Sequence, residues 1–253
     1  MSEFNNRVAV VTGAGHGIGA EYARHFAARG AHVVVADIDA EAAEAVAKGL
    51  SSAGQEASTL VLDISDAEAC TAGVDGLVSE HGSIDILINN AALYRNRDFA
   101  LAEEIGLDMW QRMIDINISG TFYMCRAAIP HMKRQASGRI VNQSSASAYA
   151  TVPRSLHYSM TKAAVITMTK TLARELGPSG ITVNAIAPGV IDTEATRLVV
   201  PGDVLSKGVE ATSLRRIGHP EDLAPVVAFL CSDGASYLTG QTVIVDGGIT
   251  MLG

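Results

Sequence analysis

A tyrosine and a lysine four residues apart are the side chains in this sequence best suited to moving a proton. They lie in the segment Tyr158-Ser-Met-Thr-Lys162, and residues at this spacing face the same side of a helix. A lysine ammonium group beside a phenol favours the phenolate and lowers the phenol pKa from its usual value of about 10. The pair therefore predicts a tyrosine general base. The alternative is a helix whose tyrosine packs and whose lysine reaches solvent.

A cluster of glycines between two apolar segments predicts a site for a phosphate group. Val8–Val11 is typical of a buried strand, and Ala20–Arg29 has apolar side chains at helical spacing. Between them the chain reads Thr12-Gly-Ala-Gly-His-Gly-Ile-Gly19. Glycines let a ligand approach the backbone closely, and the start of the following helix attracts a pyrophosphate. A purely structural turn from strand to helix is the alternative.

An aspartate at the end of the next apolar run narrows the choice of ligand. Asp37 ends the run Val33-Val-Val-Ala-Asp37, at a distance from the glycines where a carboxylate can bind the adenosine ribose of a dinucleotide. It would repel the 2′-phosphate of NADP, and neither His16 nor Ile38 is an arginine or lysine that could neutralise one. We therefore predict NAD as the cofactor, with an ordinary turn aspartate as the alternative.

Length, composition and charge limit the class of protein. The 253 residues, 48% hydrophobic and 18% charged, predict one globular domain over residues 1–253. A net charge of −8 at pH 7 disfavours nucleic acid and anionic membranes as partners. The spacing of Cys70, Cys125 and Cys231 predicts reduced, buried thiols and no metal site. No signal peptide or membrane span is apparent, so we expect a cytoplasmic protein.

Strand and helix patterns alternate along the whole chain. The predicted strands are Val8–Val11, Val33–Asp37, Ala57–Leu62, Ile84–Ile88, Arg139–Asn142, Ile181–Ala187 and Thr242–Val245. The predicted helices are Ala20–Arg29, Ala40–Ala53, Ala67–His81, Met109–Lys133, His157–Leu176 and Pro220–Ser232, with Ser65 as the cap of the third. This alternation predicts an α/β fold of Rossmann type: a doubly wound parallel sheet of about seven strands, in the order 3-2-1-4-5-6-7, with helices on both faces.

Ligands of such sheets bind beyond the carboxyl ends of the strands. The glycine-rich turn, Asn89–Ala92, Ser144–Ser145 and Pro188–Thr193 should therefore meet around one crevice. The segment of about residues 190–219 is irregular, with several glycines and prolines, and is expected to form a lid over that crevice.

In combination, these residues resemble the short-chain dehydrogenase/reductase family over essentially the full length of the chain. The resemblance rests on Thr12-Gly-Ala-Gly-His-Gly-Ile-Gly19, Asn89-Asn-Ala91, Asn117, Ser144-Ser145, Tyr158-Ser-Met-Thr-Lys162, Asn184 and Pro188-Gly189, in the expected order. It implies that Tyr158 is the acid/base and that Lys162 holds the cofactor ribose and tunes Tyr158. It also implies that Ser145, rather than Ser144, contacts the substrate oxygen and that Asn117 holds a water for the proton relay.

The motifs and the resemblance together imply the remaining site residues. The expected cofactor-binding residues are Gly13, Gly15, His16, Gly17, Ile18, Gly19, Asp37, Ile38, Asp63, Ile64, Asn90, Ala91, Tyr158, Lys162, Pro188, Gly189, Ile191 and Thr193. The expected substrate pocket comprises Tyr94, Ser145, Ser147, Val152, Tyr158 and Val190, together with Pro153 and Leu198. Ala92 and Ala148 stand where the family usually has glycine, and both are expected to reshape this pocket.

The predicted function is NAD-dependent interconversion of a largely apolar secondary alcohol and its ketone. A 3-oxoacyl thioester reductase is an alternative, but such enzymes usually use NADPH, which Asp37 disfavours. A protein that senses NAD without turnover is another, and the presence of Ser145, Tyr158 and Lys162 argues against it. The resemblance also implies a homotetramer, or failing that a dimer, built through the apolar faces of Met109–Lys133 and His157–Leu176.

Overall fold

Parallel strands form the central sheet of the protein, seen in a computed structural model that describes residues 3–94, 99–150, 152–200 and 202–251. The strands are β1 (Val8–Thr12), β2 (His32–Asp37), β3 (Ala57–Val61), β4 (Ile86–Asn89), β5 (Gly138–Gln143), β6 (Ile181–Pro188) and β7 (Thr242–Val245). Their order is β3-β2-β1-β4-β5-β6-β7, and every neighbouring pair is parallel. The predicted fold class and strand order are confirmed.

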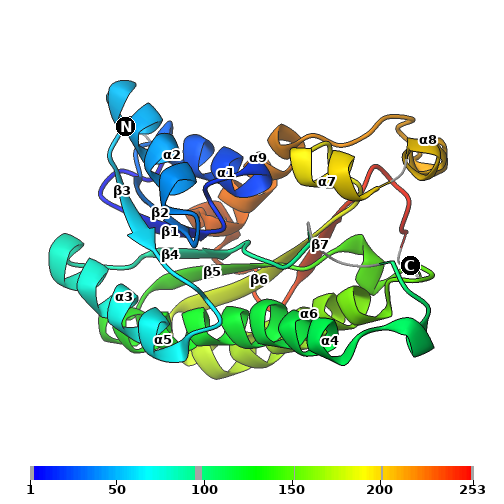
Figure 1. Cartoon of the computed structure of the whole chain (residues 1–253). Coiled ribbons are helices and arrows are strands. Elements are labelled where there is room, and N and C mark those ends of the chain that lie inside the picture. The colour runs from blue at the N-terminus through cyan, green and yellow to red at the C-terminus, as the bar shows by residue number, and fades with distance from the viewer. Residues whose placement is uncertain (1–2, 95–98, 151, 201, 252–253) are drawn as a thin grey trace.

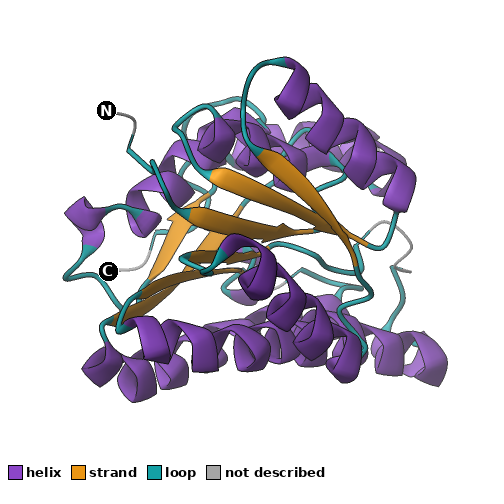
Figure 2. Cartoon of the chain, turned by 90° about the vertical axis from the view of Figure 1, so that its left-hand side faces the viewer, coloured by secondary structure: helices purple, strands orange, loops and turns teal. Residues whose placement is uncertain are grey.

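Helices cover both faces of this sheet (Figures 1 and 2). One layer contains α1 (Gly17–Ala27), α2 (Ala40–Ser52) and α9 (Pro220–Cys231). The other contains α3 (Ala67–His81), α4 (Leu107–Ile114), α5 (Thr121–Gln135) and α6 (Leu156–Leu176). Parallel strands require such crossover connections, since a tight hairpin can join only antiparallel neighbours.

Two apolar cores result, one on each side of the sheet. All five residues of β1 are buried, and successive side chains of a strand point to opposite faces. Val11 therefore joins a core with Phe26 of α1, whereas Val10 joins a core with Met124 of α5. Cys70, Cys125 and Cys231 are free and buried, as predicted.

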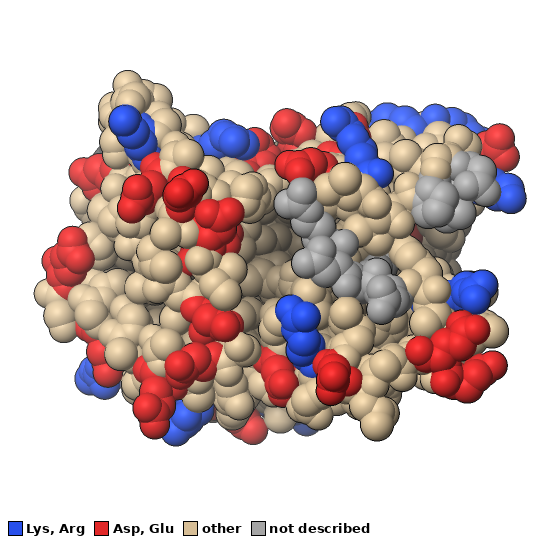
Figure 3. Space-filling view, in the orientation of Figure 1, with Lys and Arg blue, Asp and Glu red and all other residues tan. Residues whose placement is uncertain are grey.

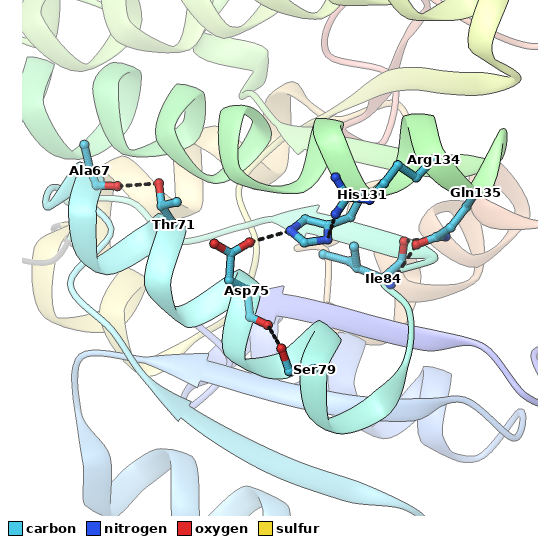
Figure 4. Close-up of polar contacts among 8 residues, drawn as sticks. All are labelled: Ala67, Thr71, Asp75, Ser79, Ile84, His131, Arg134 and Gln135. Atoms are coloured by element: carbon cyan, nitrogen blue, oxygen red, sulfur yellow. Dashed lines mark hydrogen bonds and ion pairs between the residues drawn. The ribbon is translucent and has the colours of Figure 1, made fainter.

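Polar contacts fix the end of α5 to its surroundings (Figure 4). Asp75 Oδ1 of α3 lies 2.6 Å from His131 Nε2, and the Arg134 guanidinium lies 2.5 Å from His131 Nδ1. Because a guanidinium can only donate, Nδ1 accepts and the ring proton sits on Nε2. The Gln135 side chain donates to the Ile84 carbonyl (3.1 Å) and accepts from its N–H (3.3 Å). These bonds fix α5 against α3 and the turn before β4.

The prediction of one regular helix over Met109–Lys133 is wrong in its middle. α4 and α5 are continuous, but Asp115–Gly120 between them is a π-helical turn. Such a turn inserts an extra residue into a helix and is frequent at functional sites. Gly120 ends it against Ile64, whose Cδ1 would lie 2.7 Å from a Cβ at this position. The turn is therefore fixed by a contact with the loop after β3.

The prediction that Ser65 caps α3 is also wrong. Asp66 caps the helix, because its carboxylate accepts the N–H groups of Glu68 (2.9 Å) and Ala69 (3.0 Å). Ser65 instead donates its N–H (2.9 Å) and its hydroxyl (2.7 Å) to Asp63 Oδ1. A carboxylate one residue later in the chain therefore displaces the hydroxyl as the cap.

The segment 190–219 contains two short helices, α7 (Glu194–Val199) and α8 (Gly202–Ala211). Its two ends are joined by a parallel bridge between Ile191 and Gly218. The Asp192 N–H donates to the Gly218 carbonyl (2.8 Å), and the Gly218 N–H donates to the Val190 carbonyl (3.1 Å). The segment is therefore closed at its base. Pro201 within it lies outside the described residues.

Candidate active site

A cleft of about 870 Å³ lies where the carboxyl ends of the strands meet. Figure 3 shows the molecule hollowed near the middle of one face, where most side chains are neither acidic nor basic. The cleft is lined by all the predicted cofactor-binding and substrate-pocket residues except Gly15, Pro153 and Leu198. The turns after β1, β4, β5 and β6 therefore converge as the sequence predicts.

Glycines allow the turn after β1 to close tightly. Gly13 has a φ of +63°, and a Cβ there would lie 2.8 Å from the Cα of Ala91. A Cβ at Gly19 would overlap the carbonyl oxygen of Gly13. The turn can therefore fold onto the start of α1 and the loop after β4 only with glycine at both positions.

The first amides of α1 lack a side-chain partner within the described residues. His16 is the residue before the helix and its side chain makes no capping hydrogen bond, and the first turn contains no acidic residue. The first N–H that bonds within the helix is that of Ala20, to the His16 carbonyl at 3.2 Å. The amides of Gly17, Ile18 and Gly19 precede it and belong to residues of the cleft lining. Free amides at the positive end of a helix dipole bind anions, so this cradle fits a pyrophosphate.

Gly15 supports Asp37 rather than lining the cleft. Its N–H donates to Asp37 Oδ2 at 2.8 Å, and the Asp39 N–H donates to Asp37 Oδ1 at 3.0 Å. A Cβ at Gly15 would lie 2.9 Å from the Ala42 Cβ of α2. These bonds fix the Asp37 carboxylate at the edge of the cleft, and each oxygen keeps a further lone pair for a ligand hydroxyl.

Thr12, the first residue of the glycine-rich motif, has a structural role that the sequence analysis did not assign. Its Oγ1 accepts the N–H groups of Asn90 (3.0 Å) and Ala91 (3.1 Å). The Asn90 side chain in turn donates to the carbonyls of Thr12 (2.9 Å) and Gly13 (3.0 Å). Together these bonds lock the glycine-rich turn to the loop after β4. The only sequence signal was a hydroxyl residue directly before the glycines.

Tyr158 and Lys162 are both buried on the cleft side of α6, with 8% and 3% of their surfaces exposed. Lys162 Nζ donates to the Gln143 carbonyl at 2.9 Å and lies 5.8 Å from the centre of the Tyr158 ring. A backbone carbonyl at the end of β5 therefore holds the ammonium group beside the phenol. Gln143 was not singled out from the sequence, because its backbone rather than its side chain acts here.

The two adjacent serines after β5 have different partners. The Ser144 hydroxyl is buried and donates to the Lys162 carbonyl at 2.8 Å. The Ser145 Oγ is half-buried at the cleft and accepts from the N–H (3.2 Å) and the hydroxyl (3.0 Å) of Ser147. Ser144 thus joins β5 to α6, while the Ser145 hydrogen is available to a ligand in the cleft.

Tyr94 forms a wall beside Tyr158. Their rings meet edge to face with centres 5.5 Å apart. Val152 and Val190 also line the cleft, whereas the predicted pocket residues Pro153 and Leu198 do not. The described lining therefore includes aromatic and aliphatic side chains, with the Tyr94 ring directly beside Tyr158.

Asn117 lies behind this wall rather than in the cleft lining. It is fully buried in the π-helical turn, and its Oδ1 accepts the Leu93 N–H at 2.7 Å. Its Nδ2 donates to the Thr161 hydroxyl at 3.2 Å, which donates to the Tyr158 carbonyl at 2.8 Å. The Asn117 side chain therefore links the loop that carries Tyr94 to the helix that carries Tyr158. Its predicted role in holding a water stays a prediction.

Cys125 of α5 is a buried thiol with little reactivity at neutral pH. The Cys125 thiol accepts a hydrogen bond from Asn89 Nδ2 at 3.2 Å, and burial raises its pKa to about 12. A thiol with this pKa stays protonated and is a poor nucleophile at neutral pH. Among the residues that the structure describes, no group of three or more His, Cys, Asp or Glu side chains could hold a metal ion. None of the helices in these described residues is long and apolar enough to cross a membrane.

Comparisons with known proteins agree with this geometry. Residues 13–250 match a family model described as enoyl-(acyl carrier protein) reductase. A protein of Mycobacterium tuberculosis named as an uncharacterized oxidoreductase is 45% identical over 245 residues, which cover 97% of this chain and 98% of that protein. The cis-4-hydroxycyclohexanecarboxylate dehydrogenase of Sinomonas cyclohexanicum is 40% identical, with 98% of each chain covered.

One solved structure with the same fold contains two bound compounds. It is a 7α-hydroxysteroid dehydrogenase complexed with NADH and 7-oxo glycochenodeoxycholic acid, 33% identical to this chain. The two superpose with a TM-score of 0.92 over 99% of this chain and 97% of that one. With its glycine-rich turn, its tyrosine–lysine pair and relatives of this similarity along its length, the chain belongs to the short-chain dehydrogenase/reductase family of oxidoreductases.

Proposed function

We propose that this protein is an NAD-dependent oxidoreductase that interconverts a largely apolar secondary alcohol and its ketone. One observation carries the proposal: the uncapped start of α1 and the Tyr158–Lys162 pair line the same cleft. An anion site next to a proton-handling pair is the arrangement that hydride transfer with a dinucleotide needs.

The residues of the cleft fit a dinucleotide along its length. The amides of Gly17, Ile18 and Gly19 would hold the pyrophosphate, and Asp37 would hold the adenosine ribose. Asp63 and Ile64, after β3, would flank the adenine, while Lys162 would hold the second ribose. When bound, the nicotinamide supplies or accepts the hydride, and the protein provides position and proton handling.

The charges at the Asp37 end of the cleft favour NAD over NADP. Asp37 is fixed by two backbone amides, and Asp63 lines the same end. The cations in the described lining are Arg112, which comes from α4, and Lys162, which is bonded beside Tyr158; neither comes from the turns that carry Asp37 and Asp63. A 2′-phosphate placed against the Asp37 carboxylate would therefore meet uncompensated like charge.

Tyr158 and Ser145 would act together on the substrate oxygen. In the oxidative direction the Tyr158 phenolate, favoured by the Lys162 ammonium, removes the hydroxyl proton of the alcohol. In the reductive direction the Tyr158 and Ser145 hydroxyls donate to the carbonyl oxygen as negative charge develops there. The Ser145 oxygen is already oriented by its two hydrogen bonds from Ser147.

The lining next to Tyr158 supports an apolar substrate. Tyr94 lies beside Tyr158, and Val152 and Val190 line the same cleft. Two relatives have names that refer to ring alcohols or ketones, a hydroxycyclohexanecarboxylate and a steroid. A 3-oxoacyl thioester reductase is a second candidate, because the matching family model is described by acyl-carrier-protein chemistry. Asp37 disfavours the NADPH that such enzymes usually use.

The test is a panel of secondary alcohols and ketones, with 3-oxoacyl thioesters included, assayed by NAD(P)H absorbance with each cofactor. We expect turnover of apolar ring alcohols with NAD and little with NADP. Tyr158→Phe should lower kcat by about 10²–10⁴-fold while leaving NADH binding intact. Asp37→Ala should weaken NAD binding and reduce the preference for NAD over NADP.

Three results would contradict the proposal. Activity of Tyr158→Phe equal to that of the parent would remove the proton-transfer role. A preference for NADPH and thioesters would support the reductase alternative. Tight NAD binding without turnover across the panel would favour a sensor protein.

A further inference from the structure

The order of the strands gives the cleft two ends, one at β2 and β3 and the other at β6 and β7. Asp37 ends β2 and Asp63 follows β3 at one side of the sheet, and Ser145 follows β5 beyond the central strand β4. Beyond β5 the sheet continues through β6 to the edge strand β7. The cleft lining extends this far, because it includes Val190 after β6 and Ile249 after β7. The adenosine is expected at the β2–β3 side and the rest of the cofactor reaches the turn after β6, so the part of the cleft lined by the turn after β7 is left for the substrate.

A single carboxylate builds the turn that places Ile249 there. Asp246 is 8% exposed and follows β7 directly. It accepts three successive backbone N–H groups, from Gly248 (3.0 Å), Ile249 (3.2 Å) and Thr250 (2.7 Å). Hydrogen bonds to an ionised acceptor are stronger than those between neutral groups. The conformation of residues 246–250 is therefore fixed locally, including the position of residue 249.

The same turn is bonded to its neighbours. The Gly189 N–H, after β6, donates to the Val245 carbonyl at 3.0 Å, and a Cβ at Gly189 would lie 2.7 Å from the Asp246 Cα. On its other side, the Leu214 N–H donates to the Gly247 carbonyl at 3.1 Å. The Ser213 hydroxyl also donates to the Gly248 carbonyl at 3.0 Å. The turn thus joins β6 to the segment 190–219.

We propose that Ile249 is a specificity-determining residue whose side chain limits the size of the alcohol that the cleft accepts. Asp246 is the positioning residue that holds Ile249 in place through the backbone. This inference rests on the proposed function, since it concerns the substrate end of the same cleft. It makes the turn 246–250, near the end of the sequence, one wall of the substrate end of the cleft.

The first test measures binding without turnover. The protein loaded with NADH is titrated by calorimetry with cyclic alcohols from cyclopentanol to cyclododecanol; this pair cannot react, because both partners are reduced. In Ile249→Ala, the affinity for the largest rings relative to cyclopentanol should rise by about tenfold or more, as expected for carbons removed from an apolar pocket. Met251→Ala is the matched control, since Met251 lies in the same tail but outside the lining and is 76% exposed.

The second test uses Asp246→Asn. It should raise the Kd of every cyclic alcohol and blunt the size preference, while the Kd of NADH stays at the parent value. A general loss of structure would weaken NADH binding as well, so this comparison separates positioning from unfolding. In the alcohol assay, the same variant should raise KM more than it lowers kcat.

The outcomes separate this inference from the proposed function. If the parent turns over alcohols but Ile249→Ala and Met251→Ala show the same dependence of affinity on ring size, this inference is overturned and the proposed function stands. Absence of cyclic alcohol binding by the NADH-loaded parent would also overturn it. A parent that fails to bind NADH would overturn the proposed function and this inference with it.

Discussion

Ser144 and Ser145 show how much the site depends on single residues. They are adjacent, yet one hydroxyl is bonded to the Lys162 carbonyl and the other stands in the cleft. The choice of Ser145 is implied by the resemblance to the family, whose serine precedes the tyrosine by the thirteen residues that separate Ser145 from Tyr158. The role of Thr12 could not be predicted, because its partners Asn90 and Ala91 are far away in the sequence. The sequence around a hydroxyl residue does not predict which distant backbone amides will donate hydrogen bonds to it.

A histidine of α1 predicts how stability depends on pH. Burial and the nearby Arg29 lower the pKa of His25 to about 4, and its Nε2 is buried without a hydrogen-bond partner among the described residues. The unfolded chain binds this proton at a pKa of about 6.5. Stability should therefore be lost as pH falls below that value, because the unfolded state then binds more protons than the folded state.

The measurement is urea unfolding of the protein at about pH 7.5 and about pH 5, on either side of the unfolded pKa. His25→Gln should lose less stability than the parent between these two conditions. Burial also lowers the pKa of His32, with a further effect of His81, so part of the pH dependence should remain in this variant. An equal loss in the parent and in His25→Gln would contradict the assignment.

At the scale of elements, the π-helical turn is the feature that the sequence did not predict. The boundaries of the strands and of most helices follow from local apolar periodicity and lie within a few residues of those predicted. The turn at Asp115–Gly120 does not, because its apolar pattern resembles that of an ordinary helix. It is set by contacts with distant residues, Ile64 against Gly120 and Leu93 against Asn117.

Removing the side chain at this turn should loosen the loop that carries Tyr94. Asn117→Ala leaves the Leu93 N–H without its 2.7 Å partner, which should lower stability by about 1–3 kcal/mol. Hydrogen exchange at residues 90–94 should become faster, and kcat should fall as Tyr94 and Tyr158 lose their fixed relation.

A matched variant separates this effect from a general one. Thr161→Val removes the contact between Asn117 and α6. It keeps the Leu93 N–H bond to Asn117 Oδ1 and the bond that Asn117 Nδ2 donates to the Leu93 carbonyl (3.4 Å), so exchange at residues 90–94 should stay close to that of the parent. Equal acceleration in both variants would show that the Leu93 bond is not what holds the loop.

At the scale of the whole molecule, several apolar side chains on the α4–α6 side of the sheet remain exposed. Leu107 is 83% exposed, Leu156 50% and Phe122 43%. They belong to α4, α6 and α5, respectively, which form one layer in Figure 1. Exposed apolar side chains on the helices of one layer favour an interface between subunits. We therefore expect this layer to join copies of the chain into a tetramer, or failing that a dimer.

Light scattering of the parent and of Phe122→Asp tests this expectation. The parent should have the mass of four chains, or of two, and the variant should dissociate into smaller species. Val61→Asp on the edge strand β3 is the control, because Val61 is also exposed, at 56%, but belongs to the sheet rather than to the layer of α4, α5 and α6. A monomeric parent at assay concentration would contradict the expectation.

The bridge between Ile191 and Gly218 has a consequence for how such a protein can diversify. Both ends of the segment between these two residues leave the sheet at one point. Its length and composition can therefore change without moving the strands that carry the glycine-rich turn and Asp37. The segment between Ile191 and Gly218 can therefore be exchanged while the sheet keeps its structure. Under the proposed function, new substrate preferences can then arise by changes in this segment, while the glycine-rich turn and Asp37, which lie outside it, stay in place.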